Sequence, residues 1–269
     1  AMFSNRMFRA TRNGKYMDTV EQALYNTLLA GIAMDGKHFF YVNPLEVIPQ
    51  VAENNPTMEH VKTMRQKWFG VACCPPNISR TLASISNYMY AMEGNTLYSN
   101  LFISSEIHGE LEAGEIALRI TADYPRDGKV QYEILGETAG KFVLAIRKPG
   151  YCSSCRMRIN GEDCSPVCEN GYLYLDREWR PGDKVEMILD VPFRLVRCNP
   201  RVNENIGKIA LVKGPWVYCL EEADNGNYLK SIVVSSDTEI REEFKEDTLG
   251  GTLCAMFKGK RIDYSAISD

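Results

Sequence analysis

The sequence predicts a multidomain α+β fold in which helices come first and antiparallel β-sandwich structure follows. Three observations support this fold class. Apolar residues recur at helical spacing before residue 93, short β-rich segments separated by turns come after it, and 269 residues are enough for more than one domain. We therefore expect a helical domain at residues 1–93, a β-sandwich domain at 94–222 and part of a second β domain at 223–269.

The helical domain is expected to contain two amphipathic helices. Apolar side chains recur at three- and four-residue steps from Met17 to Met34, and Asp35-Gly36 provides a turn after them. A second helix is expected from Asn77, which offers an N-cap, to about Met92. Between them the residues favour a short strand or extended loop at 38–42 and a charged helix at 57–67.

The β-sandwich is predicted from strand-like segments that no helical pattern interrupts. Such an arrangement favours an antiparallel sandwich over a parallel sheet. A polar, turn-rich stretch at 221–228 then links the sandwich to the final β segment. The predicted strands are Leu97–Ile107, Glu115–Tyr124, Lys129–Leu135, Lys141–Arg147, Cys155–Ile159, Tyr172–Leu175, Lys184–Leu189 and Ile209–Val217.

The composition excludes several classes of partner. A formal net charge of -4, from 35 acidic and 31 basic residues, leaves no basic stripe for nucleic acid or anionic lipid, so we expect a neutral ligand. The longest apolar stretch, Ala23–Met34, is shorter than the roughly 20 residues of a bilayer-spanning helix. Nine cysteines at irregular spacing indicate reduced thiols and a cytoplasmic protein, and residues 3–12 lack the pattern of a signal peptide.

Two adjacent cysteines, Cys73 and Cys74, stand just before the predicted helix start. Backbone N–H groups and the helix dipole at that position stabilise a thiolate. Both thiols could ligate one soft metal ion if further ligands arrive from elsewhere. The alternative is that they are two buried thiols in a loop, without a chemical role.

The surrounding blocks resemble a known family. Glu21–Asn26, Asp35–Glu46 and the run Cys73-Cys74-Pro75-Pro76-Asn77 occur in the order seen in the β-L-arabinofuranosidases of glycoside hydrolase family 127, and the likeness continues at 95–103 and 209–221. The resemblance implies the last helices of an (α/α)6 barrel followed by β-sandwich domains. It also implies a plant-derived arabinofuranoside or oligosaccharide as the substrate.

The resemblance further implies a zinc ion held by one glutamate and three cysteines, with one thiolate as the nucleophile of a retaining reaction. By position, Cys73 would be the nucleophile and a zinc ligand, and Cys74 a second zinc ligand. The family's Glu-x-Cys motif and its acid/base glutamate have no counterpart here. We therefore expect a carboxy-terminal fragment that has an incomplete zinc site and no activity by itself.

Three more residues are candidates for the sugar pocket. The resemblance favours substrate binding by Glu21, His38 and Tyr41, against the alternatives of a buried glutamate and a satisfied core histidine. His60 and His108 have polar neighbours and are expected at the surface.

Two further hypotheses remain open. The spacing Cys152-x-x-Cys155 and Cys164-x-x-x-Cys168 resembles a compact four-thiolate zinc site, with reduced thiols as the alternative. A non-catalytic β-sandwich protein that binds carbohydrate or another protein is the alternative to an enzyme.

The chain is also expected to associate with copies of itself. The two predicted helices would otherwise leave an apolar face in water, and a two-fold dimer of their helical segments would cover it. The residues of this face are Leu24, Leu28, Ile32, Leu82, Ile85 and Met89.

Overall fold

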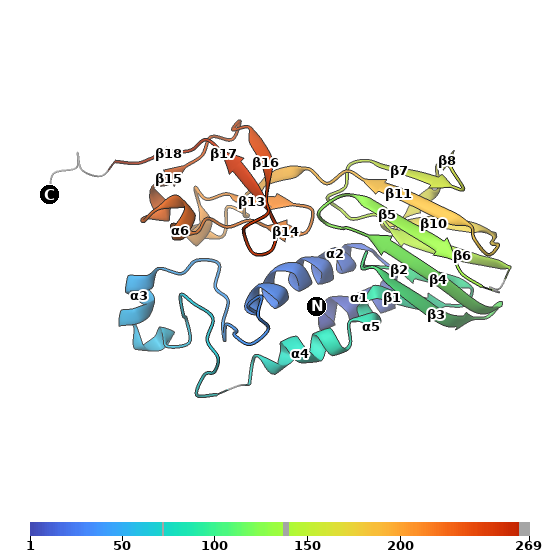
Figure 1. The fold of residues 1–269 in the computed structure, drawn as a ribbon, viewed down its shortest axis with the longest axis horizontal. Coiled ribbons are helices and arrows are strands. Elements are labelled where there is room, and N and C mark those ends of the chain that lie inside the picture. Colours follow the sequence, from blue (N-terminus) through green and yellow to red (C-terminus); the bar gives the residue numbers. More distant parts are fainter. Residues whose placement is uncertain (72, 137–139, 264–269) are drawn as a thin grey trace. The chain divides into compact units, whose positions relative to one another are not determined.

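The computed structural model describes residues 1–71, 73–136 and 140–263, which fall into two compact units, residues 1–191 and 192–269 (Figure 1). The first unit holds the N-terminal helices and two β-sheets. The boundary expected after residue 222 falls inside the second unit, because Phe193–Val196 already pairs with Ala210–Lys213 in a sheet of that unit.

Helices occupy the first 89 residues in short pieces. The helix expected from Met17 is present, but its regular part ends at Gln22 and continues as a π-helix, Ala23–Leu28, and a 3₁₀ turn, Leu29–Gly31. A helix at 49–54 was not predicted. The α-helices of the first unit are α1 (Met2–Thr11), α2 (Lys15–Gln22), α3 (Pro49–Asn54), α4 (Pro76–Ala83) and α5 (Ser86–Met89).

The charged helix expected at 57–67 is wrong, because only the 3₁₀ turn Pro56–Met58 forms there. The Asn55 side chain accepts hydrogen bonds from the backbone N–H and the hydroxyl of Thr57, which is a local alternative to helix. Farther along, Gln66 exchanges backbone hydrogen bonds of 2.9 Å with Phe39, so its N–H and C=O are used in an isolated bridge.

The helix expected to reach Met92 instead ends at Met89, and Tyr90–Glu93 is strand β1. This strand pairs with β2 (Thr96–Ser99) in a tight hairpin whose Gly94 has φ 55°, a left-handed conformation that glycine adopts without strain. The chain therefore passes from helix to strand after residue 89, three residues before the end of the helix that the apolar pattern predicts.

Two sheets form the β-sandwich of the first unit. One has the strand order β1-β2-β6-β10-β9 and the other β3-β4-β5-β11-β7-β8. All named pairs in them are antiparallel except β2 with β6, so the predicted antiparallel sandwich is confirmed with one parallel pair. The further strands are β3 (Ser105–Leu111), β4 (Gly114–Ala122), β5 (Lys129–Ile134), β6 (Lys141–Arg147), β7 (Cys155–Ile159), β8 (Glu162–Cys164), β9 (Val167–Glu169), β10 (Tyr172–Glu178) and β11 (Lys184–Leu189).

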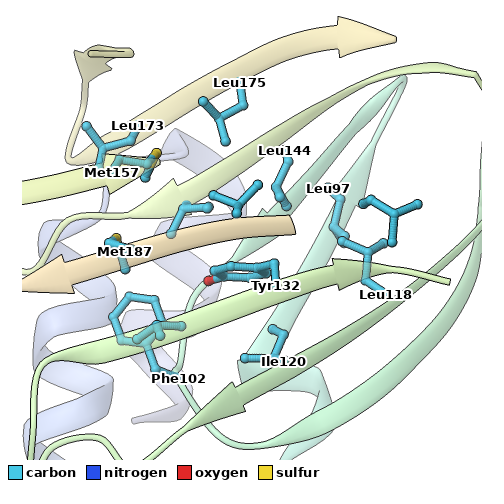
Figure 2. Close-up of a cluster of buried hydrophobic side chains, with 14 of the residues drawn as sticks. Leu97, Phe102, Leu118, Ile120, Tyr132, Leu144, Met157, Leu173, Leu175 and Met187 are labelled. Atoms are coloured by element: carbon cyan, nitrogen blue, oxygen red, sulfur yellow. The ribbon is translucent and has the colours of Figure 1, made fainter. Parts of the chain in front are cut away.

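The central strand of the five-stranded sheet, β6, is buried on both faces. Leu144 and Ile146 of β6 pack with residues of the six-stranded sheet, such as Tyr132 and Met187, in the core between the sheets (Figure 2). Ala145, on the opposite face of β6, packs instead with helix residues. Successive side chains of a strand point to opposite faces, so β6 needs an almost continuous apolar sequence.

The helices cover the outer face of this sheet. Phe8 of α1 and Met17 of α2 are fully buried in a cluster with Tyr98 and Tyr172 of the sheet. The apolar face expected to need a second copy is therefore covered largely within the chain, since Leu24 and Met89 belong to the same buried cluster. Leu82, by contrast, remains 38% exposed.

The second unit is built of short strands and one short helix. Its sheets are β12-β13-β14, β15-β18 and the hairpin β16-β17. Every helix in the described residues of either unit lacks the length or the apolar character needed to cross a bilayer. The elements of the second unit are β12 (Phe193–Val196), β13 (Ala210–Lys213), β14 (Trp216–Val217), α6 (Glu222–Asn225), β15 (Ile232–Val233), β16 (Ile240–Lys245), β17 (Thr252–Phe257) and β18 (Lys260–Arg261).

Candidate active site

Cys73 and Cys74 are exposed and lie immediately before helix α4. Pro75, rather than the expected Asn77, occupies the N-cap position, and Pro76 at the first helical position suits a helix start because its missing N–H would have no partner there. The Asn77 side chain instead donates a 3.0 Å hydrogen bond to the carbonyl of Cys74 and so fixes the turn. The local sequence thus presents both thiols at the surface rather than in the core.

Tyr41 contacts the first thiol. Its hydroxyl lies 2.6 Å from Cys73 Sγ, and the Sγ atoms of Cys73 and Cys74 are 3.7 Å apart. The Tyr41 ring packs against His60 and the buried Phe69, with ring centroids 4.4 and 5.4 Å away. These two rings hold the Tyr41 hydroxyl at the thiol, and we term Tyr41, His60, Phe69, Cys73 and Cys74 the thiol cluster.

The electrostatics favour a thiolate at Cys73. The hydrogen bond from Tyr41, with a further contribution from Cys74, lowers the pKa of the Cys73 thiol. The same contact raises the pKa of Tyr41. Both directions agree with a Tyr41 O–H that donates to a Cys73 thiolate, and a thiolate is the nucleophilic form of cysteine.

His38 is positioned by its own turn. Its Nδ1 lies 2.5 Å from Asp35 Oδ2, and Asp35 also accepts a hydrogen bond of 2.8 Å from the backbone N–H of Lys37. The Lys37 N–H is the main cause of a lowered pKa at Asp35, and His38 adds to it. The carboxylate therefore fixes the orientation of the half-buried imidazole.

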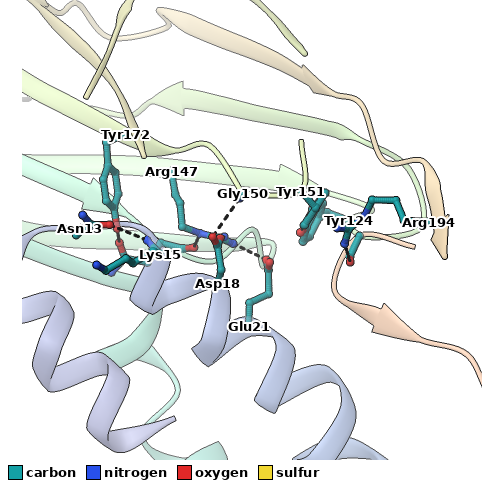
Figure 3. Close-up of polar contacts among 12 residues, drawn as sticks. Asn13, Lys15, Asp18, Glu21, Tyr124, Arg147, Gly150, Tyr151, Tyr172 and Arg194 are labelled. Atoms are coloured by element: carbon teal, nitrogen blue, oxygen red, sulfur yellow. Dashed lines mark hydrogen bonds and ion pairs between the residues drawn. The ribbon is translucent and has the colours of Figure 1, made fainter. Parts of the chain in front are cut away.

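Glu21 lies in the interior and is 1% exposed. It forms a 2.5 Å ion pair with Arg147 Nη2, while Arg147 Nη1 forms another of 2.5 Å with Asp18 (Figure 3). Burial raises the pKa of Glu21, and Arg147 opposes that effect. Arg147 Nε also donates to the carbonyl of Asn100 at 2.6 Å. We call Asp18, Glu21, Asn100 and Arg147 the arginine network.

The structure thus joins Tyr41 with Cys73 and Cys74, and gives His38 and Glu21 other partners. Sequence reasoning missed His60 and Phe69, which support Tyr41, because His60 was expected at the surface. The signal available in the sequence was aromatic residues in and after the predicted extended segment, namely Phe39, Tyr41 and Phe69.

Comparison with known proteins identifies the family. Three models for consecutive parts of one family match residues 1–87 (β-L-arabinofuranosidase, GH127 catalytic domain), 96–191 (GH127 middle domain) and 193–267 (glycoside hydrolase family 127 C-terminal domain). The chain belongs to glycoside hydrolase family 127. The resemblance seen in the sequence is confirmed, and it spans nearly the whole chain.

Several family 127 proteins align with the chain over most of its length. A non-reducing end β-L-arabinofuranosidase of Bifidobacterium longum subsp. longum is 35% identical over 264 residues, which cover 93% of this chain and 39% of that protein. A solved GH127 β-L-arabinofuranosidase from Geobacillus stearothermophilus T6 is 40% identical with a TM-score of 0.91, covering 99% of this chain and 42% of that one. A structure described as a glycoside hydrolase is 30% identical with a TM-score of 0.88, covering 99% and 45%. The chain therefore spans less than half the length of these relatives.

The family resemblance implies zinc, and the donor set of the described residues supports only part of a zinc site. Cys73 and Cys74 could supply two sulfur ligands at most, whereas a catalytic zinc site uses three protein ligands and a structural one four. No cluster of three or more His, Cys, Asp or Glu side chains in the described part of the chain is placed to hold a metal. The four cysteines of the possible second zinc site are free thiols and form no such cluster either: Cys152, Cys155, Cys164 and Cys168.

Proposed function

We propose that this family 127 chain is part of a retaining β-L-arabinofuranosidase in which Cys73 is the nucleophile. The observation that carries the proposal is the 2.6 Å contact between Tyr41 and an exposed Cys73 whose pKa is lowered. The names of the Bifidobacterium and Geobacillus relatives support this substrate class. Because the chain spans 39–45% of the relatives' lengths, the activity is proposed for the longer protein.

The chemistry at Cys73 would be a double displacement. The thiolate forms a bond to the anomeric carbon as the glycosidic C–O bond breaks, and the departing oxygen takes a proton from a general acid. Water then cleaves the C–S bond, gives its proton to the conjugate base of that acid, and releases arabinose with net retention and the free thiolate. Tyr41 would hold the sulfur in its ionised form before the first step and after the second.

The other predicted site residues fit this proposal to different degrees. His38, oriented by Asp35, and Tyr41 would contact the sugar hydroxyls from the extended segment around residue 39. Substrate binding by Glu21 stays a prediction, and its contacts in this chain are with Arg147 in the interior.

Zinc would take Cys73 and Cys74 as two of its ligands in the longer enzyme, where it would keep the thiols ionised. Its remaining ligands would come from residues that this chain does not contribute. Without them we expect the 269-residue chain to retain no stoichiometric zinc and to hydrolyse no arabinofuranoside.

Thiol alkylation tests the assignment of the nucleophile on this chain. We expect iodoacetamide to modify Cys73 faster than Cys168, another exposed cysteine, in the range from about pH 6 to 8, because the lowered pKa leaves more thiolate at Cys73. Tyr41→Phe should slow the reaction at Cys73 and leave the rate at Cys168 unchanged. Peptide mapping by mass spectrometry measures both rates, and equal rates in the unchanged chain would contradict the proposal.

A hybrid enzyme tests the activity itself. The chain would replace the matching 39% of the Bifidobacterium relative, and hydrolysis of a nitrophenyl β-L-arabinofuranoside would be followed by absorbance. We expect turnover that falls by about 10³-fold or more in Cys73→Ser, since a lost nucleophile removes the covalent route. Cys152→Ser is the control and should retain activity. A hybrid whose Cys73→Ser variant remains as active would rule out the proposed role.

A further inference from the structure

The second unit contains a pocket of about 660 Å³ between the end of α6 and the paired strands β15 and β18. Its volume lies in the range of small-molecule sites, roughly 300–1,000 Å³. The residues that line it include Asn225, Asn227, Tyr228, Ser231 and Arg261. The pocket belongs wholly to this unit and shares no residue with the thiol cluster.

Arg261 of β18 organises the wall of the pocket. Its Nη1 donates to the carbonyls of Asn227 and Tyr228 at 2.6 and 3.2 Å and to Ser231 Oγ at 2.9 Å, and its Nη2 donates to the carbonyl of Asn225 at 2.6 Å. All four acceptors are neutral oxygens of the loop 225–231. The guanidinium thus holds this loop in one shape, as a rigid fork of donors can.

The loop presents one aromatic side chain to solvent. Tyr228 is 79% exposed and has φ 59° and ψ 56°, a left-handed conformation that is rare for a bulky residue. Its carbonyl accepts hydrogen bonds from the N–H and hydroxyl of Ser231, at 2.9 and 2.8 Å, as well as from Arg261. These hydrogen bonds therefore hold Tyr228 in a strained backbone conformation. Its exposed ring does not contribute to packing. Strain of this kind concentrates at binding sites.

We propose that this pocket binds a saccharide, with the Tyr228 ring as a stacking platform. The C–H face of a sugar ring packs on an aromatic face, and the neighbouring exposed amides of Asn225 and Asn227 are of the type that binds sugar hydroxyls. Arg261 is the sole charged side chain among the described residues that line the pocket, and both its terminal nitrogens already bond to the loop. These features favour a neutral ligand over an anionic one.

Calorimetric titration of the full chain tests this inference, with an arabino-oligosaccharide as the probe and inorganic phosphate as the charged comparison. We expect saccharide binding that weakens by about tenfold or more in Tyr228→Ala and persists in Tyr228→Phe, which keeps the ring. Tyr41→Phe and Cys73→Ser should leave it unchanged, so that the result does not depend on the proposed nucleophile.

Tyr228→Gly separates binding from folding. Glycine accepts the left-handed conformation, so the thermal midpoint of this variant should be no lower than that of the unchanged chain, while binding is lost. Binding that survives in both Tyr228→Ala and Tyr228→Gly would overturn the proposal. So would the absence of any saccharide binding, binding of phosphate alone, or loss of binding in Tyr41→Phe instead.

Discussion

The arginine network and the thiol cluster belong to the same unit, yet they are built in opposite ways. Arg147 is fully buried, and each of its three donor nitrogens has a partner. Two of these partners are carboxylates and the third is a backbone carbonyl. Cys73 is exposed, and the described residues of the segment from 32 to 75 that carries the cluster contain one six-residue α-helix. Leu45 and Met64 of this segment are 97% and 71% exposed.

The difference separates the residues that hold the fold from those to which we assign the chemistry. A buried charge with several partners strongly disfavours any other arrangement of the helix on the sheet, because an unpaired charge in the interior is costly. Cys73, the proposed nucleophile, would have to meet a substrate, and it lies on an exposed loop supported by a few aromatic rings. Loops on a rigid scaffold are common carriers of function.

Replacing the central arginine should give the largest effect. Arg147→Met leaves Glu21 buried without its partner, so we expect a loss of about 3–5 kcal/mol in the free energy of unfolding. Arg119→Met is the matched control, since Arg119 also bridges two carboxylates, Glu106 and Glu133, but with a side chain 46% exposed, and its loss should change stability little. Urea denaturation measures both. Equal effects would mean that burial does not decide the contribution of the pair.

One methionine substitution made in both regions sharpens the contrast. Met17 of α2 is fully buried against the sheet, so Met17→Ala should cost about 2–5 kcal/mol. Met64 is 71% exposed, and Met64→Ala should stay within about 0.5 kcal/mol. Thermal and urea unfolding curves provide the comparison, and a large loss for Met64→Ala would show that the segment is packed more tightly than its exposure indicates.

The smallest expected effect concerns acid stability. Burial alone would raise the pKa of Asp183, but hydrogen bonds from the Asn160 amide and the Arg180 N–H, at 2.8 and 3.0 Å, outweigh it and lower this pKa. A carboxyl with a lowered folded-state pKa contributes stability above its unfolded pKa near 4, and the contribution is lost as pH falls through the folded value.

Asp183→Asn should therefore make the free energy of unfolding fall less steeply with pH below about pH 4. The difference should be only a small part of the total loss of stability in acid. Asp35→Asn, in the loop region, is the comparison, because the Asp35 pKa is also lowered but its side chain is 44% exposed, against 11% for Asp183. Denaturant midpoints at several pH values measure the slopes. A steeper slope in Asp183→Asn than in the unchanged chain would contradict this assignment.

Most strands of the sandwich were predictable because their apolar residues recur between regular turns, as in β5, β7 and β11. The single strand expected at Leu97–Ile107 was wrong, because β2 and β3 are separate strands of different sheets. The short strands β8 and β9 were missed, since three residues carry no readable period. The charged helix expected at 57–67 failed because a bridge between Phe39 and Gln66, 27 positions apart, overrides local preference.

The candidate site was only partly predictable. The adjacent cysteines and the helix after them were readable, as was Tyr41, but the contact between Tyr41 and Cys73 joins residues 32 positions apart. Substrate binding by Glu21 was predicted from the family resemblance, whereas its pairing with Arg147, 126 positions away, could not be read from the sequence. No local sequence pattern predicts an ion pair between residues so far apart in the chain.

The distance along the chain between Glu21 and Arg147 also has a consequence for synthesis. Helix α2 leaves the ribosome long before strand β6, and at roughly 5–20 residues per second the 126 residues between them take about 6–25 s to make. During that interval the carboxylates of α2 lack the cation that neutralises them, and Met17 and Val20 lack the sheet that buries them. The nascent chain thus exposes the apolar face of α2 for several seconds. In that interval a chaperone that recognises exposed apolar surface can bind it.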